Sequence, residues 1–458
     1  MLGKVKSIHF IGIGGIGMSG MAELLINLGY SISGSDLKQS DRTVHLQSIG
    51  AKINIGHSKN NIQNTDLAVY SSAVNENNCE IVESKNKKIP VIKRAEMLGE
   101  LLKTKDNSIA ISGTHGKTTT TSILGTMLDE IGLKPTIVVG GIVKGIKSNS
   151  LLGDGDIIIV EADEYDKTLL SLKPSMSIVT NIDYEHIDIY PSLDSLKETF
   201  IKFINSTPFF GVNVIYYDDL NIKSIIPRIK RPYLTYGKSP NCDIKYANPT
   251  FNKSSSMFDL SIYNKDYGKV ELNVPGEHNI LNSLAAIGIA LELDIPIDQI
   301  ISSISKYNGV ERRFEIKHKT KNNITIVDDY AHHPSEIDAT ISAAKNGWEI
   351  NKLIVVFQPH LYSRTKNFFK EFAMALSKSD VVILTDIYPA REKPIEGISS
   401  KIILDNLDGV DSYILDKEDI CNKISSISKK NDMVIVMGAG DIKSITSDIY
   451  KKIEACNV

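Results

Sequence analysis

A lysine and a threonine that could handle the phosphates of a nucleotide stand in a glycine-rich turn near residue 115. The run Gly113-Thr-His-Gly-Lys-Thr-Thr119 follows Ile109–Ile111, a short apolar stretch that predicts a buried strand. A strand, a glycine turn and a helix N-terminus form a cradle whose backbone N–H groups bind an anion. Lys117 can then reach the outer phosphates, and Thr118 can offer its hydroxyl to Mg²⁺. The sequence therefore predicts an ATP site here.

This loop departs from the usual phosphate-loop spacing, in which four residues separate two glycines before Lys-Ser/Thr. Ile111 stands where the first glycine would fall, so the turn is the shorter Gly113-x-x-Gly116. An ordinary glycine turn after a strand is the alternative interpretation. The β-branched run Thr118–Thr121 is poor helix material, because such side chains lose χ1 freedom in a helix. That cost favours the phosphate-binding interpretation.

Carboxylates cluster where a second apolar run ends. The segment 156–166 begins as a predicted strand and ends in Glu161, Asp163, Glu164 and Asp166. Carboxylates at the carboxyl end of a strand, beside a phosphate loop, suit Mg²⁺-ATP. Glu161 is the first candidate ligand. For the other three, charge near a helix N-terminus explains their presence equally well.

A third predicted strand leads from Ser177 into a polar loop. The loop has the pattern Asn181-x-Asp-x-x-His186-x-Asp188. A histidine among such polar residues, after a strand of the same sheet, is better explained as a ligand than as a core residue. We expect His186 to bind a second Mg²⁺ or a substrate oxygen.

The first segment of the chain contains another glycine loop. A predicted strand over 7–11 runs into Gly12-x-Gly14-x-x-Gly17, a helix is expected over 18–28, and a strand over 31–36 ends in Asp36. This is the Rossmann-type fingerprint, which alone predicts NAD. Its physics requires only a diphosphate on a helix N-terminus and a sugar or base near Asp36. A uridine diphosphate group satisfies that as well as a dinucleotide does.

Two more polar positions in this segment follow predicted strands, which we expect over 53–56, 67–70 and 91–92. Ser71 stands at a strand end, where ligands bind in open α/β sheets, although an ordinary helix cap explains it equally well. His57 could form a hydrogen bond with a sugar or a diphosphate.

The rest of the chain predicts a β-rich stretch over 211–272 and then alternating strands and helices. Strands are expected over 324–329, 353–357, 381–385 and 433–437, with polar residues at their ends, which indicates a parallel α/β domain. Arg312 and Arg313 offer two positive forks suited to phosphate or carboxylate. Asn279 and Asn282 open a predicted helix, where they could read an adenine edge or simply cap the helix.

Bulk properties narrow the class of protein. The chain has 458 residues, enough for two to four domains, and a formal net charge of −3, which gives no electrostatic argument for nucleic acid or an anionic membrane. No apolar run has the length of a membrane span, and the N-terminal residues do not read as a signal peptide. The four cysteines show no metal-ligand spacing, and reduced thiols in a cytoplasm are expected.

Together these motifs resemble those of the Mur ligases, the ATP-dependent amide-forming enzymes of peptidoglycan synthesis. The resemblance spans nearly the whole chain, in the family's order. Its carriers are Gly12-Ile-Gly-Gly-Ile-Gly-Met-Ser-Gly20, Gly113-Thr-His-Gly-Lys-Thr-Thr-Thr120, Glu161-Ala-Asp-Glu164, Thr180-Asn-Ile-Asp-Tyr-Glu-His-Ile-Asp188, Glu277-His-Asn279, Glu311-Arg-Arg-Phe314, Asp328-Asp-Tyr-Ala-His-His-Pro334 and Phe357-Gln-Pro-His360.

The resemblance implies an α/β protein of three domains: a Rossmann-like UDP-sugar domain over 1–105, a central phosphate-loop Mg-ATP domain over 106–318, and a Rossmann-like carboxyl-terminal domain over 319–458 that closes over ATP and the amino acid. The motifs most resemble the member that joins L-alanine to UDP-N-acetylmuramate. That reaction would proceed through an acyl phosphate and a tetrahedral intermediate, with ATP and two Mg²⁺ ions. The resemblance implies a cytoplasmic enzyme with no nucleic-acid or integral-membrane partner, either monomeric or dimeric.

The resemblance also implies roles for individual residues. Lys117, His186, His332 and His360 would be catalytic, and Thr118, Glu161 and His186 would hold metal. ATP would contact Gly113, Thr114, His115, Gly116, Lys117, Thr118, Thr119, Asn279, Arg313 and Asp329. The sugar and amino-acid substrates would contact Gly12, Gly14, Gly15, Ile16, Gly17, Asp36, His57, Ser71, Arg312, Tyr330 and Arg364.

Two departures from the family pattern accompany the resemblance. Leu361 stands where many members have arginine, so one substrate contact is absent or replaced, and neither Lys197 nor Lys202 falls at the position of the carbamylated lysine of sibling ligases. Three rival hypotheses remain: the related ligase that recycles a whole tripeptide onto the same sugar, an NAD-dependent oxidoreductase, and a non-catalytic nucleotide-binding module. The predicted Mg-ATP residues over 113–188 argue against the oxidoreductase.

Overall fold

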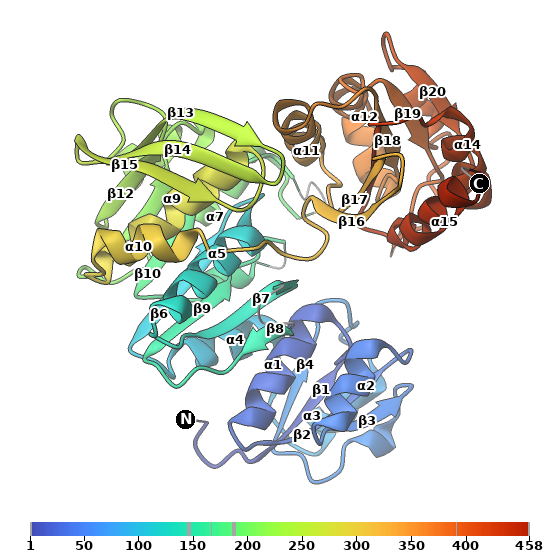
Figure 1. Ribbon diagram of the computed structural model, residues 1–458. Coiled ribbons are helices and arrows are strands. Elements are labelled where there is room, and N and C mark those ends of the chain that lie inside the picture. The colour runs from blue at the N-terminus through green and yellow to red at the C-terminus, as the bar shows by residue number, and fades with distance from the viewer. Residues whose placement is uncertain (1, 144–147, 166, 186–188, 391, 457–458) are drawn as a thin grey trace. The chain divides into compact units, whose positions relative to one another are not determined.

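The computed structural model describes residues 2–143, 148–165, 167–185, 189–390 and 392–456. Its strands form three separate sheets (Figure 1). The chain divides into two compact units. The first comprises 1–248, 258–271 and 280–308, and the second comprises 249–257, 272–279 and 309–458.

The first sheet has five parallel strands in the order β3-β2-β1-β4-β5. The order reverses beside β1, so the loops after β1 and β4 flank a topological switch point, where open α/β sheets bind ligands. The expected strands are confirmed, and the first helix begins two residues earlier than predicted. The elements are β1 (Ser7–Ile11), α1 (Ile16–Asn27), β2 (Ser31–Asp36), α2 (Asp41–Ser48), β3 (Lys52–Ile55), η1 (Lys59–Asn61), β4 (Leu67–Tyr70), α3 (Cys79–Asn86), β5 (Val91–Lys93) and α4 (Arg94–Leu102).

The second sheet has ten strands in the order β15-β14-β13-β12-β11-β10-β6-β9-β7-β8. Its phosphate-loop strand β6 (Asn107–Ser112) lies between β10 and β9 and is parallel to both. The β-rich stretch expected over 211–272 is confirmed. The other elements are α5 (Lys117–Glu130), β7 (Thr136–Val143), β8 (Ser148–Leu151), β9 (Ile157–Glu161), α6 (Thr168–Ser171), β10 (Met176–Val179), α7 (Leu193–Ile204), β11 (Asn213–Tyr216), α8 (Leu220–Ile225), η2 (Ile226–Arg228), β12 (Tyr233–Gly237), β13 (Ile244–Asn252), β14 (Ser255–Ile262), β15 (Lys265–Leu272), α9 (Glu277–Glu292) and α10 (Ile297–Ile304).

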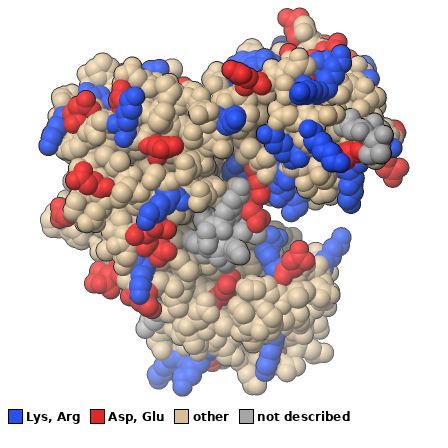
Figure 2. All heavy atoms as spheres, viewed as in Figure 1, with Lys and Arg blue, Asp and Glu red and all other residues tan. Residues whose placement is uncertain are grey.

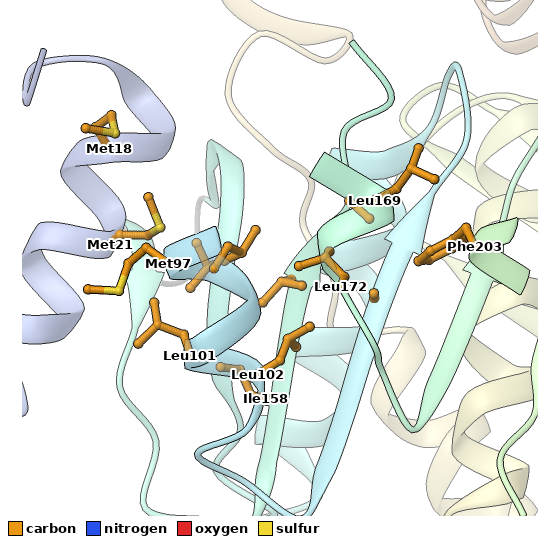
Figure 3. Close-up of a cluster of buried hydrophobic side chains, with 14 of the residues drawn as sticks. Met18, Met21, Met97, Leu101, Leu102, Ile158, Leu169, Leu172 and Phe203 are labelled. Carbon is orange, nitrogen blue, oxygen red and sulfur yellow. The ribbon is translucent and has the colours of Figure 1, made fainter. Parts of the chain in front are cut away.

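A continuous hydrophobic core joins the first sheet's helices to the second sheet (Figure 3). Helix α4 approaches α6 closely because Gly99 has no side chain: a Cβ there would lie 2.7 Å from the Ser171 carbonyl oxygen. The labelled members of this cluster are Met18, Met21, Met97, Leu101, Leu102, Ile158, Leu169, Leu172 and Phe203. Burying this apolar area stabilises both parts of the first unit together.

The third sheet has six strands in the order β16-β17-β21-β18-β19-β20. Four of them, β17, β18, β19 and β21, are the strands that the sequence predicts, and they are parallel as predicted. Two edge strands were not predicted: β20 is also parallel, whereas β16 runs antiparallel to β17, so the sheet is not parallel throughout. The elements are β16 (Glu315–Lys319), β17 (Thr325–Asp329), α11 (Pro334–Gly347), β18 (Leu353–Phe357), α12 (Tyr362–Leu376), β19 (Val381–Leu384), α13 (Lys401–Leu404), β20 (Asp411–Ile414), α14 (Lys417–Ile427), β21 (Met433–Met437), η3 (Ile442–Ile445) and α15 (Thr446–Cys456).

The surface carries charges of both signs. Figure 2 shows Lys and Arg interspersed with Asp and Glu over the viewed face. Among the described residues, no helix combines the length and the apolar character needed to cross a bilayer.

Candidate active site

The turn between β6 and α5 is held by the segment that follows β10. Thr180 Oγ1 donates to the His115 carbonyl oxygen at 2.5 Å, and Asn181 Oδ1 accepts from the His115 N–H at 2.9 Å. Gly113 has φ +136°, and a Cβ there would lie 1.9 Å from Thr180 Oγ1. Gly116, the N-cap of α5, has φ +83°, a left-handed conformation that favours glycine. The N-terminus of α5 therefore opens from this turn, and a helix N-terminus is suited to binding an anion.

Lys117 is fixed by an ion pair inside this turn. Its Nζ donates to Glu164 Oε2 at 2.7 Å and to the carbonyl oxygens of Gly113 and Thr114 at 2.5 and 3.1 Å. Burial alone would lower the pKa of Lys117, but the carboxylates of Glu164 and Asp163 raise it above its ordinary value. The ammonium therefore stays charged. Glu164 therefore forms an ion pair with Lys117 and does not cap a helix.

Glu161, the last residue of β9, fits a cation site. Its side chain forms a hydrogen bond with Thr118, whereas its buried Oε1 has no hydrogen-bond partner among the described residues. Burial raises the pKa of Glu161, and the Thr118 hydrogen bond and Lys117 oppose that rise. Mg²⁺ prefers oxygen ligands, and this buried carboxylate oxygen and the neighbouring threonine hydroxyl are both suitable ligands.

Helix α9 also contributes to the phosphate-loop region. Asn282 Oδ1 accepts from Thr120 Oγ1 at 3.2 Å and would lie 2.6 Å from a Cβ at Gly116. Asn279 is buried, and its Nδ2 donates to the Pro275 carbonyl oxygen at 2.7 Å. The closeness of Asn282 to Gly116 explains why the N-cap of α5 is a glycine, and the Asn279 hydrogen bond anchors the start of α9.

The glycine loop after β1 is braced from two sides. Asp36 Oδ2 accepts from the Gly14 N–H at 2.8 Å, and Arg42 Nε donates to the Gly14 carbonyl oxygen at 2.7 Å. A Cβ at Gly17 would lie 2.7 Å from Arg94 Nη1. Asp36 therefore lies at the loop, as predicted, and one of its oxygens supports the loop directly. Gly15 caps α1, and Ile16 is its exposed first residue.

Ser71 lies beside this loop, since a Cβ at Gly12 would be 3.2 Å from Ser71 Cβ. The helix-cap alternative for Ser71 is wrong, because the next helix, α3, begins at Cys79 and is capped by Asn78.

His57 is oriented by buried Glu80. His57 Nδ1 lies 3.1 Å from Glu80 Oε2 and 3.0 Å from Ser35 Oγ. Glu80 also accepts from Ser35 Oγ and from Asn61 Nδ2, each at 2.5 Å. Burial acts to raise the pKa of Glu80, yet hydrogen bonds from His9, Ser35 and Asn61 bring it down to about 2. A carboxylate that is ionised at neutral pH thus holds the imidazole in place.

In the second unit, two arginines flank one tyrosine. The guanidinium carbons of Arg312 and Arg313 lie 4.9 and 5.4 Å from the centre of the Tyr330 ring. Arg312 is fixed by Asp328 at 3.1 Å, and Arg313 by Glu336 at 3.3 Å. Both cations are thereby held at the carboxyl end of β17.

Asp329, the last residue of β17, links the segment before β16 to the loop after β17 through hydrogen bonds. Its Oδ2 accepts from the Phe314 N–H at 2.8 Å, and its Oδ1 accepts from the Ala331 N–H at 2.7 Å. Burial raises its pKa to about 6, although Arg313 and these hydrogen bonds act in the opposite direction.

Two of the predicted histidines lie side by side. The ring centres of His332 and His360 are 5.9 Å apart, and His360 stacks on Tyr388 at 5.7 Å. Arg364, which is buried, places Nη1 3.4 Å from His360 Nδ1. The structure therefore brings His332, His360 and Arg364 together in one cluster.

Leu361, the departure from the family pattern, is the N-cap of α12. It has φ +70°, unusual for leucine, and its N–H donates to the Tyr388 carbonyl oxygen at 3.0 Å. The backbone at this position is therefore tied to the loop after β19. His186, Asp188 and Asp166 lie outside the described residues, so their predicted roles stay predictions.

Three α/β domains with a phosphate loop in the second define a nucleotide-using enzyme of several domains. Family models match almost the whole chain: "Mur ligase family, catalytic domain" at 7–106, "Mur ligase middle domain" at 111–290, and "Mur ligase, glutamate ligase domain" at 312–440. The chain belongs to the Mur ligase family, and its three sheets are those of the family's three-domain architecture.

Individual relatives agree over full length. The chain is 46% identical over 458 residues to UDP-N-acetylmuramate–L-alanine ligase from Trichlorobacter lovleyi, covering 99% of this chain and 100% of the relative. It is 47% identical over 439 residues to the same enzyme from Endomicrobium trichonymphae, covering 96% and 97% of the two chains.

Solved structures extend the comparison to the fold. The UDP-N-acetylmuramate–alanine ligase of Thermotoga maritima superimposes with a TM-score of 0.83 at 29% identity, covering 98% of this chain and 99% of that one. A murein peptide ligase from Psychrobacter arcticus gives 0.70 at 21% identity, covering 98% and 99%, and so shares the fold.

Proposed function

We propose that this protein joins L-alanine to the lactyl carboxylate of UDP-N-acetylmuramate, using ATP and releasing ADP and phosphate. The enzyme is an ATP-dependent UDP-N-acetylmuramate–L-alanine ligase of peptidoglycan precursor synthesis. The observation that carries this conclusion is the full-length identity of 46% to a ligase of that name. We place the reaction in the cytoplasm, where ATP and nucleotide sugars are made.

A carboxylate is a poor electrophile, and phosphorylation supplies it with a leaving group. The γ-phosphoryl group would pass to the lactyl oxygen, giving an acyl phosphate and ADP. The amine of L-alanine would then attack the acyl carbon, and phosphate would leave from the tetrahedral intermediate. Lys117 would offset the charge on the transferring group, since its ammonium is already fixed at the α5 N-terminus.

Thr118 and Glu161 would hold one Mg²⁺, and the unpartnered Glu161 Oε1 supports this assignment. The ion would neutralise phosphate charge when bound. A second Mg²⁺ would be held with the help of His186. The turn residues Gly113 to Thr119 would bind the phosphates, and Asn279, Arg313 and Asp329 would contact ATP.

The loop Gly12–Gly17, with Asp36, His57 and Ser71, would bind the UDP-sugar. Its place at the topological switch point of the first sheet supports this role. In the second unit, His332, His360 and Arg364 would receive L-alanine and the sugar carboxylate, with Arg312 and Tyr330 beside them. The cluster of cationic and aromatic groups suits carboxylate binding. We propose domain boundaries near residues 105 and 318, with the third domain closing during the reaction.

The test is phosphate release from Mg-ATP with UDP-N-acetylmuramate, comparing L-alanine with the tripeptide L-alanyl-γ-D-glutamyl-meso-diaminopimelate. We expect release that depends on both the sugar and L-alanine. Release with the tripeptide alone would make the protein the recycling ligase. Release with neither, together with nicotinamide binding, would favour the oxidoreductase.

A further inference from the structure

Glu336 uses its two carboxylate oxygens for two different partners. It is the third residue of α11, and its side chain is 12% exposed. Oε1 accepts from Arg313 Nη1 at 3.3 Å. Oε2 accepts from the His332 N–H at 3.0 Å and lies 3.4 Å from His332 Nδ1. One carboxylate therefore joins an arginine that precedes β17 to a histidine that follows it.

The same contacts define the proton position on His332. Its Nδ1 lies 3.0 Å from the Tyr330 carbonyl oxygen as well as near Glu336 Oε2, and both of these groups accept. A neutral imidazole in this setting carries its proton on Nδ1, which leaves Nε2 as the acceptor. An amine that attacks an acyl phosphate must lose a proton, and an acceptor nitrogen suits that need.

The four side chains form a closed ring of contacts. Arg313 pairs with Glu336, Glu336 holds His332, the His332 ring packs edge-on against Tyr330 at 5.2 Å, and Tyr330 lies under Arg313 at 5.4 Å. Because each member touches two others, a displacement of the Arg313 guanidinium is passed to the His332 imidazole through the carboxylate.

We infer that Glu336 is a positioning residue that couples the ATP contact Arg313 to the amino-acid contact His332. This inference rests on the proposed function for the roles of those two residues. Binding of the triphosphate to Arg313 then orders the histidine that receives the amine.

A purely structural explanation is available, since an acidic residue in a helix's first turn stabilises the helix. That role needs one oxygen and no arginine. Glu336→Gln separates the two explanations, because its amide oxygen can still accept from the His332 N–H while the charge on Arg313's partner is lost. Asp419→Asn is the matched control, because Asp419 is the third residue of α14 and is exposed.

The first test is steady-state kinetics. We expect Glu336→Gln to raise the KM values of both ATP and L-alanine about 5- to 30-fold, with UDP-N-acetylmuramate binding and the melting temperature unchanged. Adding Arg313→Lys should raise the ATP KM no further than Arg313→Lys alone does. Asp419→Asn should change neither KM. An increase in only one KM, or a lowered melting temperature with both KM values unchanged, would overturn the inference.

The second test needs no alanine turnover. In histidine-labelled protein, the His332 signal is assigned by its loss in His332→Gln. Mg-ATP should shift that signal in the wild type and in Asp419→Asn, but not in Glu336→Gln. If the wild type shows the shift yet releases no phosphate with L-alanine, the substrate assignment fails and the coupling stands. An equal shift in Glu336→Gln refutes the coupling whatever the substrate.

Discussion

At the scale of single residues, the proposed ATP site contains a lysine that the protein keeps charged and hydrogen-bonded. The Lys117 ammonium is surrounded by a carboxylate and two carbonyl oxygens. This arrangement places a positive charge at the N-terminus of α5 before any phosphate is handled. Phosphoryl transfer is accelerated by such fixed charge, because little reorganisation is needed in the transition state.

Replacing Lys117 should therefore separate turnover from sugar binding. We expect Lys117→Ala to lower kcat/KM for ATP by at least about 10³-fold, since one preorganised charge is removed. The UDP-sugar affinity, measured by calorimetry, should be unchanged. Lys103→Ala is the control, because Lys103 is a surface residue paired with Glu100. Loss of sugar binding in Lys117→Ala would disprove our division of labour between the two glycine loops.

The turn itself should tolerate no side chain at Gly113. In Gly113→Ala the new Cβ would overlap Thr180 Oγ1, so the turn must distort. We expect ATP binding to weaken more than about tenfold, with a loss of stability above the ~1 kcal/mol that a left-handed φ alone costs alanine.

Gly132→Ala provides the comparison for Gly113→Ala. Gly132 also has positive φ, +91°, yet nothing lies within 4 Å of its Cβ position. Its substitution should cost stability alone, as measured by urea unfolding, and leave the ATP affinity intact. Equal ATP affinities for the two alanine variants would contradict the proposed role of the turn.

Sequence reasoning found the residues of the glycine loops but not all of their partners. Sequence reasoning can identify Lys117, Thr118 and Glu161 because each follows closely after an apolar run that predicts a strand. The sequence does not decide whether Glu164 binds Mg-ATP or stabilises a helix N-terminus. It predicts Asn282 only as an adenine contact or a helix cap, because its actual partner, Thr120, lies 162 positions away in the chain. Glu336 and Arg94 gave no signal, since ordinary acidic and basic residues near helix starts have many explanations. Pairing of distant side chains is a property of the packed fold.

At the scale of elements, helix α3 is fastened to the first sheet by one buried carboxylate. Glu80 accepts hydrogen bonds from Ser35 of β2, from the Ser58 N–H and from Asn61 of η1. Its pKa of about 2 lies below the ordinary 4.5, so folding favours the ionised form.

Acid should therefore loosen this part of the protein. The unfolded chain takes up a proton on Glu80 near pH 4.5, before the folded chain does near pH 2. The stabilisation is fully present above about pH 4.5 and is lost as the pH falls toward 2, amounting to about 2–3 kcal/mol. Urea unfolding of Glu80→Gln between pH 3.5 and 7 should show a weaker pH dependence than the wild type.

Glu83→Gln is the control for the acid experiment, because Glu83 lies on the same helix and pairs with Lys87 at the surface. Its pH dependence should match that of the wild type. An unchanged pH dependence in Glu80→Gln would show that folding does not lower the pKa of this carboxyl group.

The two strands of the third sheet that the sequence missed share a physical reason. Strands β17, β18, β19 and β21 are apolar runs buried on both faces, which periodicity detects. Strands β16 and β20 lie at the two edges of the same sheet and contain mostly polar residues. Their side chains face water, so their sequences lack the apolar pattern, and only pairing with a neighbour makes them strands.

At the scale of the whole molecule, the core shared by α4 and the second sheet predicts how the protein melts. Leu101 is fully buried in that core, and Leu376 is fully buried in the core of the third sheet. We expect two calorimetric transitions, one for each compact unit. Leu101→Ala should lower one of them by about 2–4 kcal/mol in unfolding free energy, and Leu376→Ala the other. A shift of both transitions by either variant would contradict two independent units.

The ion pair between Lys117 and Glu164 has a consequence for selectivity among phosphate compounds. Glu164 competes with an incoming anion for Lys117, because both would share the charge of one ammonium. Inorganic phosphate or a nucleoside monophosphate would make too few contacts to overcome the competition from Glu164. A triphosphate would also bind the N–H groups of the turn. We therefore expect the Lys117–Glu164 pair to make the site select a triphosphate over the small phosphates of the cell.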